Sequence, residues 1–139
     1  RSGINSDLGF SEADRRENIR RIAEVCKLFT DTGIITLAAF VSPTSALRKL
    51  AREIVGKEHF FEIYVSTPLE ECERRDVKGL YAKARSGAIP EFTGITAPFE
   101  EPEHPELRLD TTHLSVEECI RRIVRAIMPI ISIDPKSRY

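Results

Sequence analysis

Apolar positions follow a helical period in some parts of the chain and form short continuous runs in others. In the stretch 9–33 they recur every three or four residues, which predicts a helix that begins at the N-cap candidate Ser11 and stops near Gly33. The runs at 34–41 and 60–66 are instead continuously apolar. That second pattern predicts two strands that are buried on both faces.

The rest of the chain continues this alternation of strands and helices. Three more helices are predicted at 42–55, 68–75 and 115–131, and a further short strand is predicted at 107–112. Side chains suited to helix starts stand at Ser42 or Thr44 for the first of these helices and at Ser115 for the last. Strand–helix alternation with buried strands predicts an α/β fold with three layers, a parallel sheet covered by helices on both faces.

Composition narrows the class of protein without naming a function. The chain has 139 residues, a length typical of one domain, and a formal net charge of −1. Its three cysteines and three histidines are scattered, so a zinc site is not expected and a reducing cytoplasm is the simplest setting. The apolar run at 34–41 is far too short to span a membrane, and no secretory signal opens the sequence.

One basic stretch stands out in this nearly neutral chain. Residues 74–85 carry five cationic side chains, and the only anionic side chain among them is Asp76. Concentrated positive charge in a neutral protein indicates an anionic partner. The alternative is an ordinary solvated helix face, which the charge cluster by itself does not exclude.

Four stretches in a fixed order carry a specific resemblance to a known family: LGFSEADRRENIRRIAEV, FVSP, RDVKGLYAKARSG and FTGITAPFEEPEHPEL. They closely resemble adenylylsulfate kinase (APS kinase), from Arg1 to about Met128. The resemblance implies a P-loop NTPase-like fold. It also implies transfer of the ATP γ-phosphate to the 3′-hydroxyl of adenosine 5′-phosphosulfate, which makes PAPS in sulfate assimilation.

The same resemblance implies the partners of the reaction. They are ATP with Mg²⁺ and adenylylsulfate, and neither nucleic acid nor a membrane is expected. A homodimer is the expected assembly, and fusion to or association with an ATP sulfurylase is left open. None of the residues in the sequence is assigned to the metal.

The sequence lacks the phosphate-binding loop that such a kinase needs. Neither GxxxxGK[ST] nor GxGxxG occurs in it. In the family a Walker A loop and a DGDNIR segment precede the four stretches, and Arg1 fits the arginine that ends DGDNIR. We therefore expect the first strands and the P-loop to lie outside the given sequence, with one of those strands placed between 34–41 and 60–66.

The resemblance assigns most of the candidate site to adenylylsulfate, through Arg1, Phe10, Arg15, Asn18, Val41, Ser42, Lys78, Glu91 and Phe92. Arg15 and Asn18 are three residues apart and share a helix face, where arginine suits phosphate or sulfate and asparagine suits an adenine edge. Phe10 and Phe92 would stack on the adenine. A hydrophobic staple before Ser11 is a second, compatible reading of Phe10.

The remaining candidates belong to ATP and to the reaction itself. Arg75, Leu114 and Cys119 are assigned to ATP binding, although Cys119 also suits a core position. Lys83 and Arg85 are candidates to neutralise the transferred phosphoryl group. Segment 75–87 then acts as a lid, mobile without nucleotide because glycines flank it and its cations repel each other.

Ser42 is a catalytic candidate because it matches a family serine described as a phosphoserine intermediate. We expect it instead to act as an N-cap or to donate a hydrogen bond to the ligand, since direct phosphoryl transfer between two bound nucleotides needs no covalent stage.

A rival hypothesis comes from another functional class. A non-catalytic, kinase-like domain that binds PAPS could regulate an ATP sulfurylase, and the missing P-loop is compatible with it. The intact RDVKGLYAKAR and RRENIRR favour the enzyme, because a domain without catalysis would be free to lose its lid cations. A generic nucleoside or sugar kinase is disfavoured by the EFTGI and GFSEADR motifs.

Overall fold

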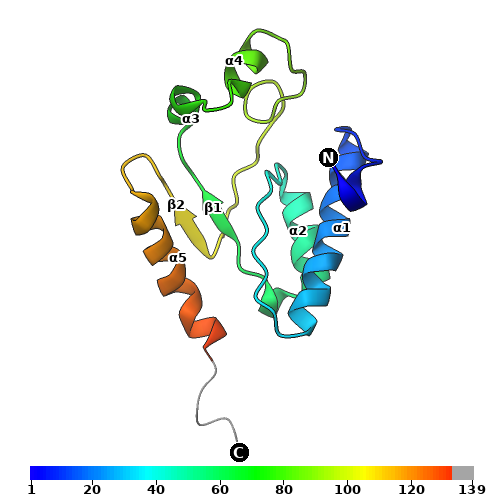
Figure 1. Cartoon of the computed structure of the whole chain (residues 1–139), viewed down its shortest axis with the longest axis vertical. Helices are drawn as coiled ribbons and strands as arrows, with labels where there is room; N and C mark the ends of the chain where they lie inside the picture. Colours follow the sequence, from blue (N-terminus) through cyan, green and yellow to red (C-terminus); the bar gives the residue numbers. More distant parts are fainter. Residues whose placement is uncertain (133–139) are drawn as a thin grey trace, which may run out of the picture. The chain divides into compact units, whose positions relative to one another are not determined.

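The computed structural model describes residues 1–132 of the chain, and these residues divide into two compact units. Unit 1 consists of Arg1–Phe60 and Ile89–Glu103. Unit 2 consists, among the described residues, of Phe61–Ala88 and 104–132. The elements of both units are labelled in Figure 1.

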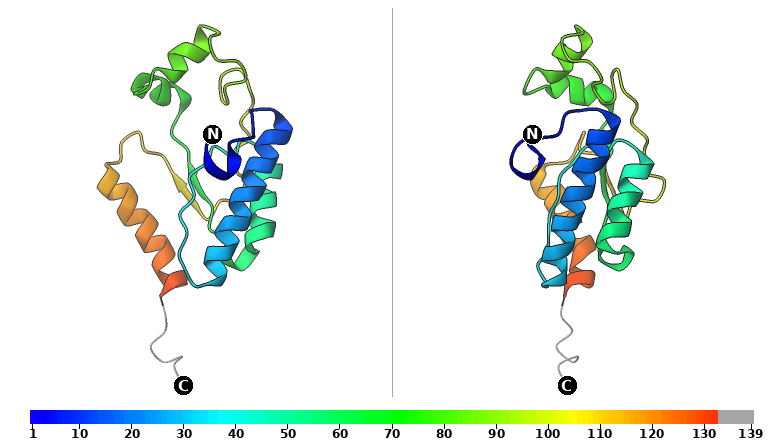
Figure 2. Two further views of the ribbon diagram at one scale, coloured as in Figure 1. Left: turned by 45° about the vertical axis from the view of Figure 1, so that its right-hand side comes forward. Right: turned by 90° about the vertical axis from the view of Figure 1, so that its right-hand side faces the viewer.

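Unit 1 is helical. Its elements are η1 (Gly3–Asn5), α1 (Glu12–Asp31), α2 (Ser45–Val55) and η2 (Lys57–His59). The helices α1 and α2 lie side by side (Figures 1 and 2). Each contributes buried apolar residues, Ile19 and Ala23 from α1 and Leu47 and Val55 from α2. This buried face explains the helical period of apolar positions in both segments.

Side chains cap the starts of α1 and α2, as predicted. The Ser11 hydroxyl accepts a hydrogen bond from the backbone N–H of Asp14 at the start of α1. Of the two candidates for α2, Thr44 is the cap, and its hydroxyl accepts from the N–H of Leu47. Both bonds satisfy N–H groups that have no partner within the helix. The N-cap role predicted for Ser42 is therefore wrong.

The buried strand predicted at 34–41 is wrong. Within the described residues this segment joins no sheet, and the side chains of Leu37 and Val41 are 84% and 63% exposed. A strand requires a neighbour that accepts and donates its backbone hydrogen bonds. None of the described residues supplies a ladder to 34–41, so the apolar run remains without a partner.

Unit 2 contains the sheet. Its elements are β1 (Ile63–Val65), α3 (Leu69–Arg75), α4 (Leu80–Arg85), β2 (Leu107–Leu109) and α5 (Val116–Ile131). The strands β1 and β2 are parallel, with Ile63 opposite Leu107 and Val65 opposite Leu109. The guanidinium of Arg108 lies 5.0 Å from the ring centre of its cross-strand partner Tyr64.

The predicted sheet is thus confirmed in part. The α/β class and the parallel pairing hold, but the sheet has two short strands within the described residues. Residues 60–66 form a strand only at Ile63–Val65, and Val65 is 59% exposed rather than buried. The predicted strand between 34–41 and 60–66, placed outside the given sequence, remains a prediction.

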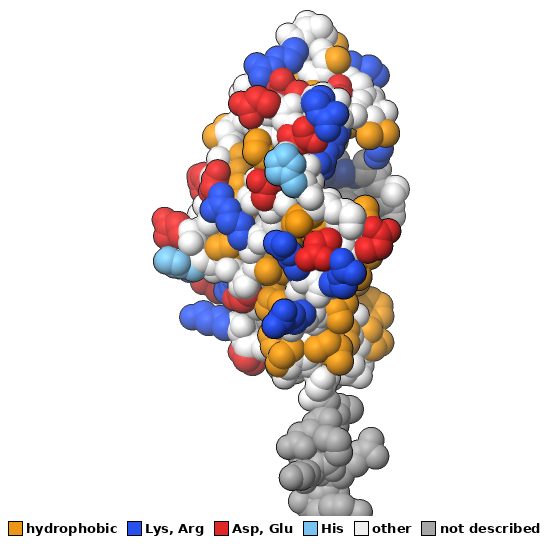
Figure 3. Space-filling view, turned by 90° about the vertical axis from the view of Figure 1, so that its left-hand side faces the viewer, with side chains coloured by type: hydrophobic (Ala, Val, Ile, Leu, Met, Phe, Trp, Pro, Cys, Tyr) orange, Lys and Arg blue, Asp and Glu red, His pale blue; other side chains and the backbone are white. Residues whose placement is uncertain are grey.

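The last helix, α5, begins as predicted, because the Ser115 hydroxyl accepts from the N–H of Glu118. Along it, apolar side chains four residues apart are exposed at Val116, Ile120, Val124 and Met128. Figure 3 shows apolar side chains gathered in the lower part of one face of the molecule. Among the described residues, no helix combines the length and apolar character that a membrane crossing requires.

Candidate functional site

Arg15 joins two distant segments that carry candidate residues for adenylylsulfate. Its Nε donates to the carbonyl oxygen of Phe10 at 3.0 Å, and its Nη2 donates to the carbonyl oxygen of Glu91 at 3.1 Å. Arg15 lies in the first turn of α1, so the capping by Ser11 sets the start of the helix that carries it. The Arg15 guanidinium thereby binds both Phe10, which directly precedes Ser11, and Glu91, which directly precedes Phe92.

Arg1 covers one face of the Phe10 ring. Its guanidinium carbon lies 4.9 Å from the ring centre, and its Nη1 donates to the carbonyl oxygen of Asp14. The Phe10 side chain is nevertheless 64% exposed. Arginine over an aromatic face is a favourable cation–π arrangement. The remaining exposed ring surface is free to contact an aromatic ligand.

Hydrogen bonds within the turn itself hold the backbone of Phe92 in place. Glu91 has a φ of +52°, a backbone conformation that is unfavourable for residues other than glycine. The N–H of Phe92 donates to the Thr96 hydroxyl at 2.8 Å, and the Phe92 carbonyl accepts from three N–H groups, those of Ile95, Thr96 and Ala97. Strained backbone of this kind persists where its surroundings fix it, often at functional sites.

Ser42 has the second positive φ among the non-glycine residues described, at +41°. Its carbonyl oxygen accepts from Nη1 of Arg48. Ser42 is half-buried and its neighbour Val41 is exposed, whereas Asn18 is half-buried one turn beyond Arg15 on α1. The structure therefore gives these three residues defined positions in unit 1.

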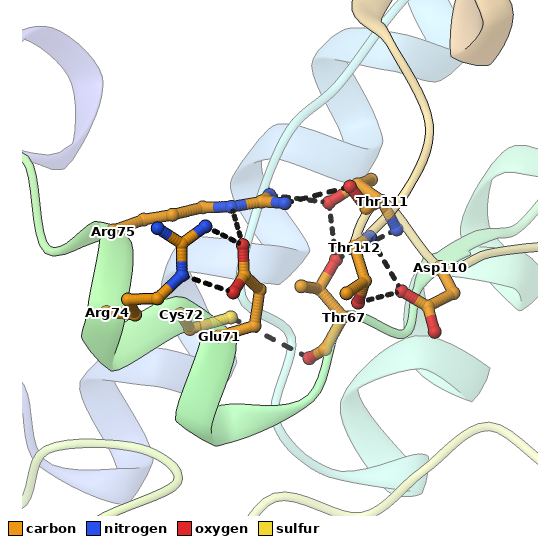
Figure 4. A network of polar contacts seen from close by, with 8 residues as sticks. All are labelled: Thr67, Glu71, Cys72, Arg74, Arg75, Asp110, Thr111 and Thr112. Carbon is orange, nitrogen blue, oxygen red and sulfur yellow. Dashed lines mark hydrogen bonds and ion pairs between the residues drawn. The ribbon is translucent and has the colours of Figure 1, made fainter.

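In unit 2, Arg75 is the centre of a polar network at the end of α3 (Figure 4). Its Nε donates to Glu71, its Nη1 to the Thr111 hydroxyl and its Nη2 to the Thr111 carbonyl, at 2.6, 2.8 and 2.8 Å. Glu71 also binds Arg74. These two arginines, Arg74 first, lower the pKa of the Glu71 carboxyl to about 2.

The lid segment contains a short helix that periodicity did not predict, α4. The two oxygens of the Asp76 carboxylate accept hydrogen bonds from the N–H groups of Tyr81 and Ala82, which lie in the first turn of α4. These hydrogen bonds from backbone N–H groups hold the pKa of Asp76 below its ordinary value, and the bond from Ala82 has the largest effect. The one acid in the basic stretch therefore stabilises the start of α4.

The prediction that the cations of the lid repel each other is wrong, because three of them are paired with acids. Arg74 and Arg75 are paired with Glu71, and Arg85 donates from Nε and Nη2 to one oxygen of Glu73. In the described part of the chain, only the side chains of Lys78 and Lys83 among the five cations form no ion pair or hydrogen bond. Both lysines are exposed.

The last two candidates, Leu114 and Cys119, lie around the start of α5. Leu114 directly precedes the Ser115 cap, and Cys119 is a free cysteine in the first turns of the helix. Both side chains are half-buried. No group of three His, Cys, Asp or Glu side chains placed to hold a metal ion occurs among residues 1–132.

Sequence reasoning missed the acids and threonines that hold the arginines of unit 2. Glu71 precedes Arg75 by four residues, a helical spacing that could have predicted their pairing. No local signal links Thr111 to Arg75, which are 36 residues apart. That contact depends on the pairing of β1 with β2.

Comparison with known proteins gives matches to adenylylsulphate kinases. The family model described as Adenylylsulphate kinase matches residues 1–110. An adenylyl-sulfate kinase of Bacteroides thetaiotaomicron is 66% identical over 131 residues, covering 94% of this chain and 65% of that relative. One of Geotalea uraniireducens is 58% identical over 127 residues, covering 91% of this chain and 61% of that relative.

A solved structure gives the same match in three dimensions. The Mycobacterium tuberculosis APS kinase CysC in complex with AMPPNP and APS has a TM-score of 0.85 to this chain at 45% identity, covering 90% of this chain and 73% of that one. The chain spans 65% of the first of the two curated relatives and 61% of the second, less than two thirds of each. On the family match and this fold, the chain belongs to the adenylylsulphate kinase family.

Proposed function

We propose that the protein transfers the γ-phosphate of ATP to the 3′-hydroxyl of adenosine 5′-phosphosulfate, making PAPS and ADP. Membership of the adenylylsulphate kinase family supports this reaction, as do the names of the curated relatives. The related M. tuberculosis protein is described in complex with AMPPNP, an ATP analogue, and with APS. In the reaction the 3′-oxygen forms a bond to the γ-phosphorus, and the bond from that phosphorus to the leaving oxygen of ADP breaks.

The single observation that carries the proposal is the convergence of motif residues on Arg15. Phe10 and Glu91 are 81 positions apart in the sequence, yet both carbonyl oxygens accept from one guanidinium. The aromatic residues Phe10 and Phe92 thereby belong to segments joined in one unit. Two aromatic side chains on segments that are joined by one cationic side chain suit an adenine nucleotide that carries phosphate and sulfate.

We assign the adenylylsulfate anion to Arg1, Arg15 and Lys78, and its adenine to Phe10, Phe92 and Asn18. Arg1 and Arg15 bind backbone carbonyls and form no ion pair in the described part of the chain. Their charges are therefore available to an anionic ligand. Ser42, Val41 and Glu91 would border the ligand, and Ser42 needs no covalent stage.

We assign ATP to Arg75, Leu114 and Cys119. Lys83 would stabilise the phosphoryl group during transfer, since it carries a charge that no described acid neutralises. For Arg85 such a role requires release from Glu73. Residues 1–132 contain no group of three or more His, Cys, Asp or Glu side chains placed to hold a metal ion. We expect Mg²⁺ to be bound mainly through the phosphates of ATP.

The setting of the reaction is a further part of the proposal. Scattered, free cysteines at Cys26, Cys72 and Cys119 agree with a reducing cytoplasm. We propose a homodimer as the assembly. Association with an ATP sulfurylase is tested by co-purification of the two activities.

The experiment measures PAPS formation by the complete gene product, with ATP, Mg²⁺ and adenylylsulfate. We expect ADP and PAPS to appear in equal amounts, and the reaction to depend on adenylylsulfate. The rival function, a non-catalytic domain that binds PAPS, predicts PAPS binding in calorimetry without product formation. A protein that binds neither nucleotide would contradict both functions.

A further inference from the structure

The polar network around Arg75 lies where the two strands of the sheet end. The carbonyl oxygen of Leu109 accepts from the N–H of Ser66, which continues the parallel pairing beyond Val65. Two residues past the pair Val65–Leu109, the hydroxyls of Thr67 and Thr111 lie 2.6 Å apart. The N–H of Thr111 also donates to the Thr67 hydroxyl. The position of Thr111 is thus set by the register of the strands.

From this anchored position Thr111 offers two acceptors to one side chain. Its hydroxyl and its carbonyl oxygen receive Nη1 and Nη2 of Arg75, and Glu71 receives Nε (Figure 4). Three donors of a planar guanidinium bound to two residues fix both its place and the orientation of its plane. The Arg75 side chain remains 39% exposed.

The Glu71 side chain is more buried than the two arginines that it binds. The Glu71 side chain is 13% exposed, compared with 34% for Glu17 and 34% for Glu118, which also bind two arginines each on their own helices. Arg21, one of the two arginines bound to Glu17, also has partners outside its helix, namely Asp7 and the carbonyl oxygen of Ile4. Glu71 differs in its lower exposure and in where its arginine Arg75 is bound, because Thr111 lies two residues past the end of β2.

We infer that Glu71 and Thr111 are positioning residues that hold the Arg75 guanidinium in the orientation in which it binds ATP. The inference rests on the proposed function for the assignment of ATP to Arg75. In parallel α/β sheets ligands bind beyond the carboxyl ends of the strands, which is where Thr67 and Thr111 lie. A guanidinium already fixed there loses little side-chain freedom when the nucleotide arrives.

The test compares nucleotide affinities of Glu71→Gln, Thr111→Val and Thr111→Ser with those of the wild type, using the complete gene product. Calorimetry with AMPPNP reports the ATP site, and calorimetry with adenylylsulfate reports the other substrate. We expect Glu71→Gln and Thr111→Val to weaken AMPPNP binding about tenfold, the effect of one charge-assisted hydrogen bond. Adenylylsulfate affinity should be unchanged, and Thr111→Ser, which keeps the hydroxyl, should restore AMPPNP binding.

Glu17→Gln is the matched control, because Glu17 also pairs with arginines three and four residues further along its helix. It should leave AMPPNP affinity unchanged. Equal AMPPNP affinities of wild type, Glu71→Gln and Thr111→Val would overturn the inference, as would equal losses for both substrates. If Glu71→Gln does not fold in thermal melts, the Thr111→Val and Thr111→Ser pair decides. No AMPPNP binding by the wild type would instead contradict the proposed function, and the inference with it.

Discussion

Unit 1 and unit 2 both present arginine side chains among the residues proposed to bind nucleotides, but they partner these arginines differently. In unit 1, Arg15 donates to the neutral carbonyl oxygens of Phe10 and Glu91. In unit 2, Arg75 and Arg85 form ion pairs with Glu71 and Glu73. An anion can therefore bind Arg15 without displacing a carboxylate, whereas at Arg85 it must compete with Glu73.

The comparison teaches that counting cations does not identify the charges available to a ligand. The basic stretch in unit 2 has five cationic side chains, but only the Lys78 and Lys83 side chains form no ion pair or hydrogen bond within residues 1–132. Arg85 instead connects α4 to Glu73 at the end of α3. The predictions below follow from this division between uncompensated and paired cations.

The largest effect is expected for Arg15→Ala. This change removes a positive charge and two hydrogen bonds that hold the segments of Phe10 and Phe92. Affinity for adenylylsulfate or PAPS in calorimetry should fall by more than about a hundredfold, since each charge-assisted bond contributes about tenfold or more. Arg16→Ala is the matched control, because Arg16 is an exposed neighbour on α1 whose side chain forms no hydrogen bond, ion pair or ring contact with the described residues. Equal affinities of the two variants would contradict the role of Arg15.

A smaller but specific effect is expected for the two unpaired lysines. Lys83→Ala should lower kcat by roughly tenfold to a hundredfold, because a charge aimed at the transferred phosphoryl group acts mainly in the transition state. Lys78→Ala should raise KM for adenylylsulfate with a smaller change in kcat. Steady-state kinetics of both variants separates the two roles. Wild-type rates for both would mean that these lysines belong only to a solvated helix face.

Releasing Arg85 should alter the lid more than the chemistry. Glu73→Gln removes the acceptor charge that binds Nε and Nη2 of Arg85. Backbone hydrogen exchange in residues 75–87 should then become a few-fold faster without nucleotide, with kcat changed by less than about threefold. Addition of ADP and adenylylsulfate should restore protection in the wild type and the variant. Unaltered exchange in Glu73→Gln would show that this ion pair does not hold the lid.

The smallest effect concerns acid stability. The pKa of Glu71 is about 2 in the folded protein, below its ordinary value of 4.5, because Arg74 and then Arg75 donate to it. The unfolded chain therefore binds the proton more tightly, and stability falls as the pH drops from about 4.5 to about 2. Chemical denaturation across this range should give a shallower pH dependence for Glu71→Gln than for the wild type. Parallel curves would contradict the pairing of Glu71 with these arginines.

Local interactions are the part of this molecule that could be predicted from the sequence. The caps at Ser11 and Ser115 were predicted because each hydroxyl bonds an N–H three residues further along the chain. The four motif stretches led to the family, which is confirmed. The pairing of Glu71 with Arg75 could also have been predicted, since four residues bring side chains together on a helix.

The failures came from contacts between distant residues. The apolar run 34–41 has the composition of a buried strand, yet a strand forms only where another strand completes its backbone hydrogen bonds, and none of the described residues does so. The lid cations were expected to repel each other, but tertiary contacts bring Glu73 to Arg85, twelve residues away. Neither outcome is encoded in the local pattern of apolar and charged residues.

By itself, the sequence determined the family, the starts of the capped helices and the residue types of the candidate site, because these depend on motifs and on neighbours within one helical turn. Only the tertiary structure decided that Arg15 joins Phe10 to Glu91 and that Thr111 orients Arg75, across 76 and 36 residues respectively. The physical reason is geometric. A hydrogen bond needs its donor and acceptor within about 3 Å, and for distant residues only the packing of helices and the register of strands bring them that close.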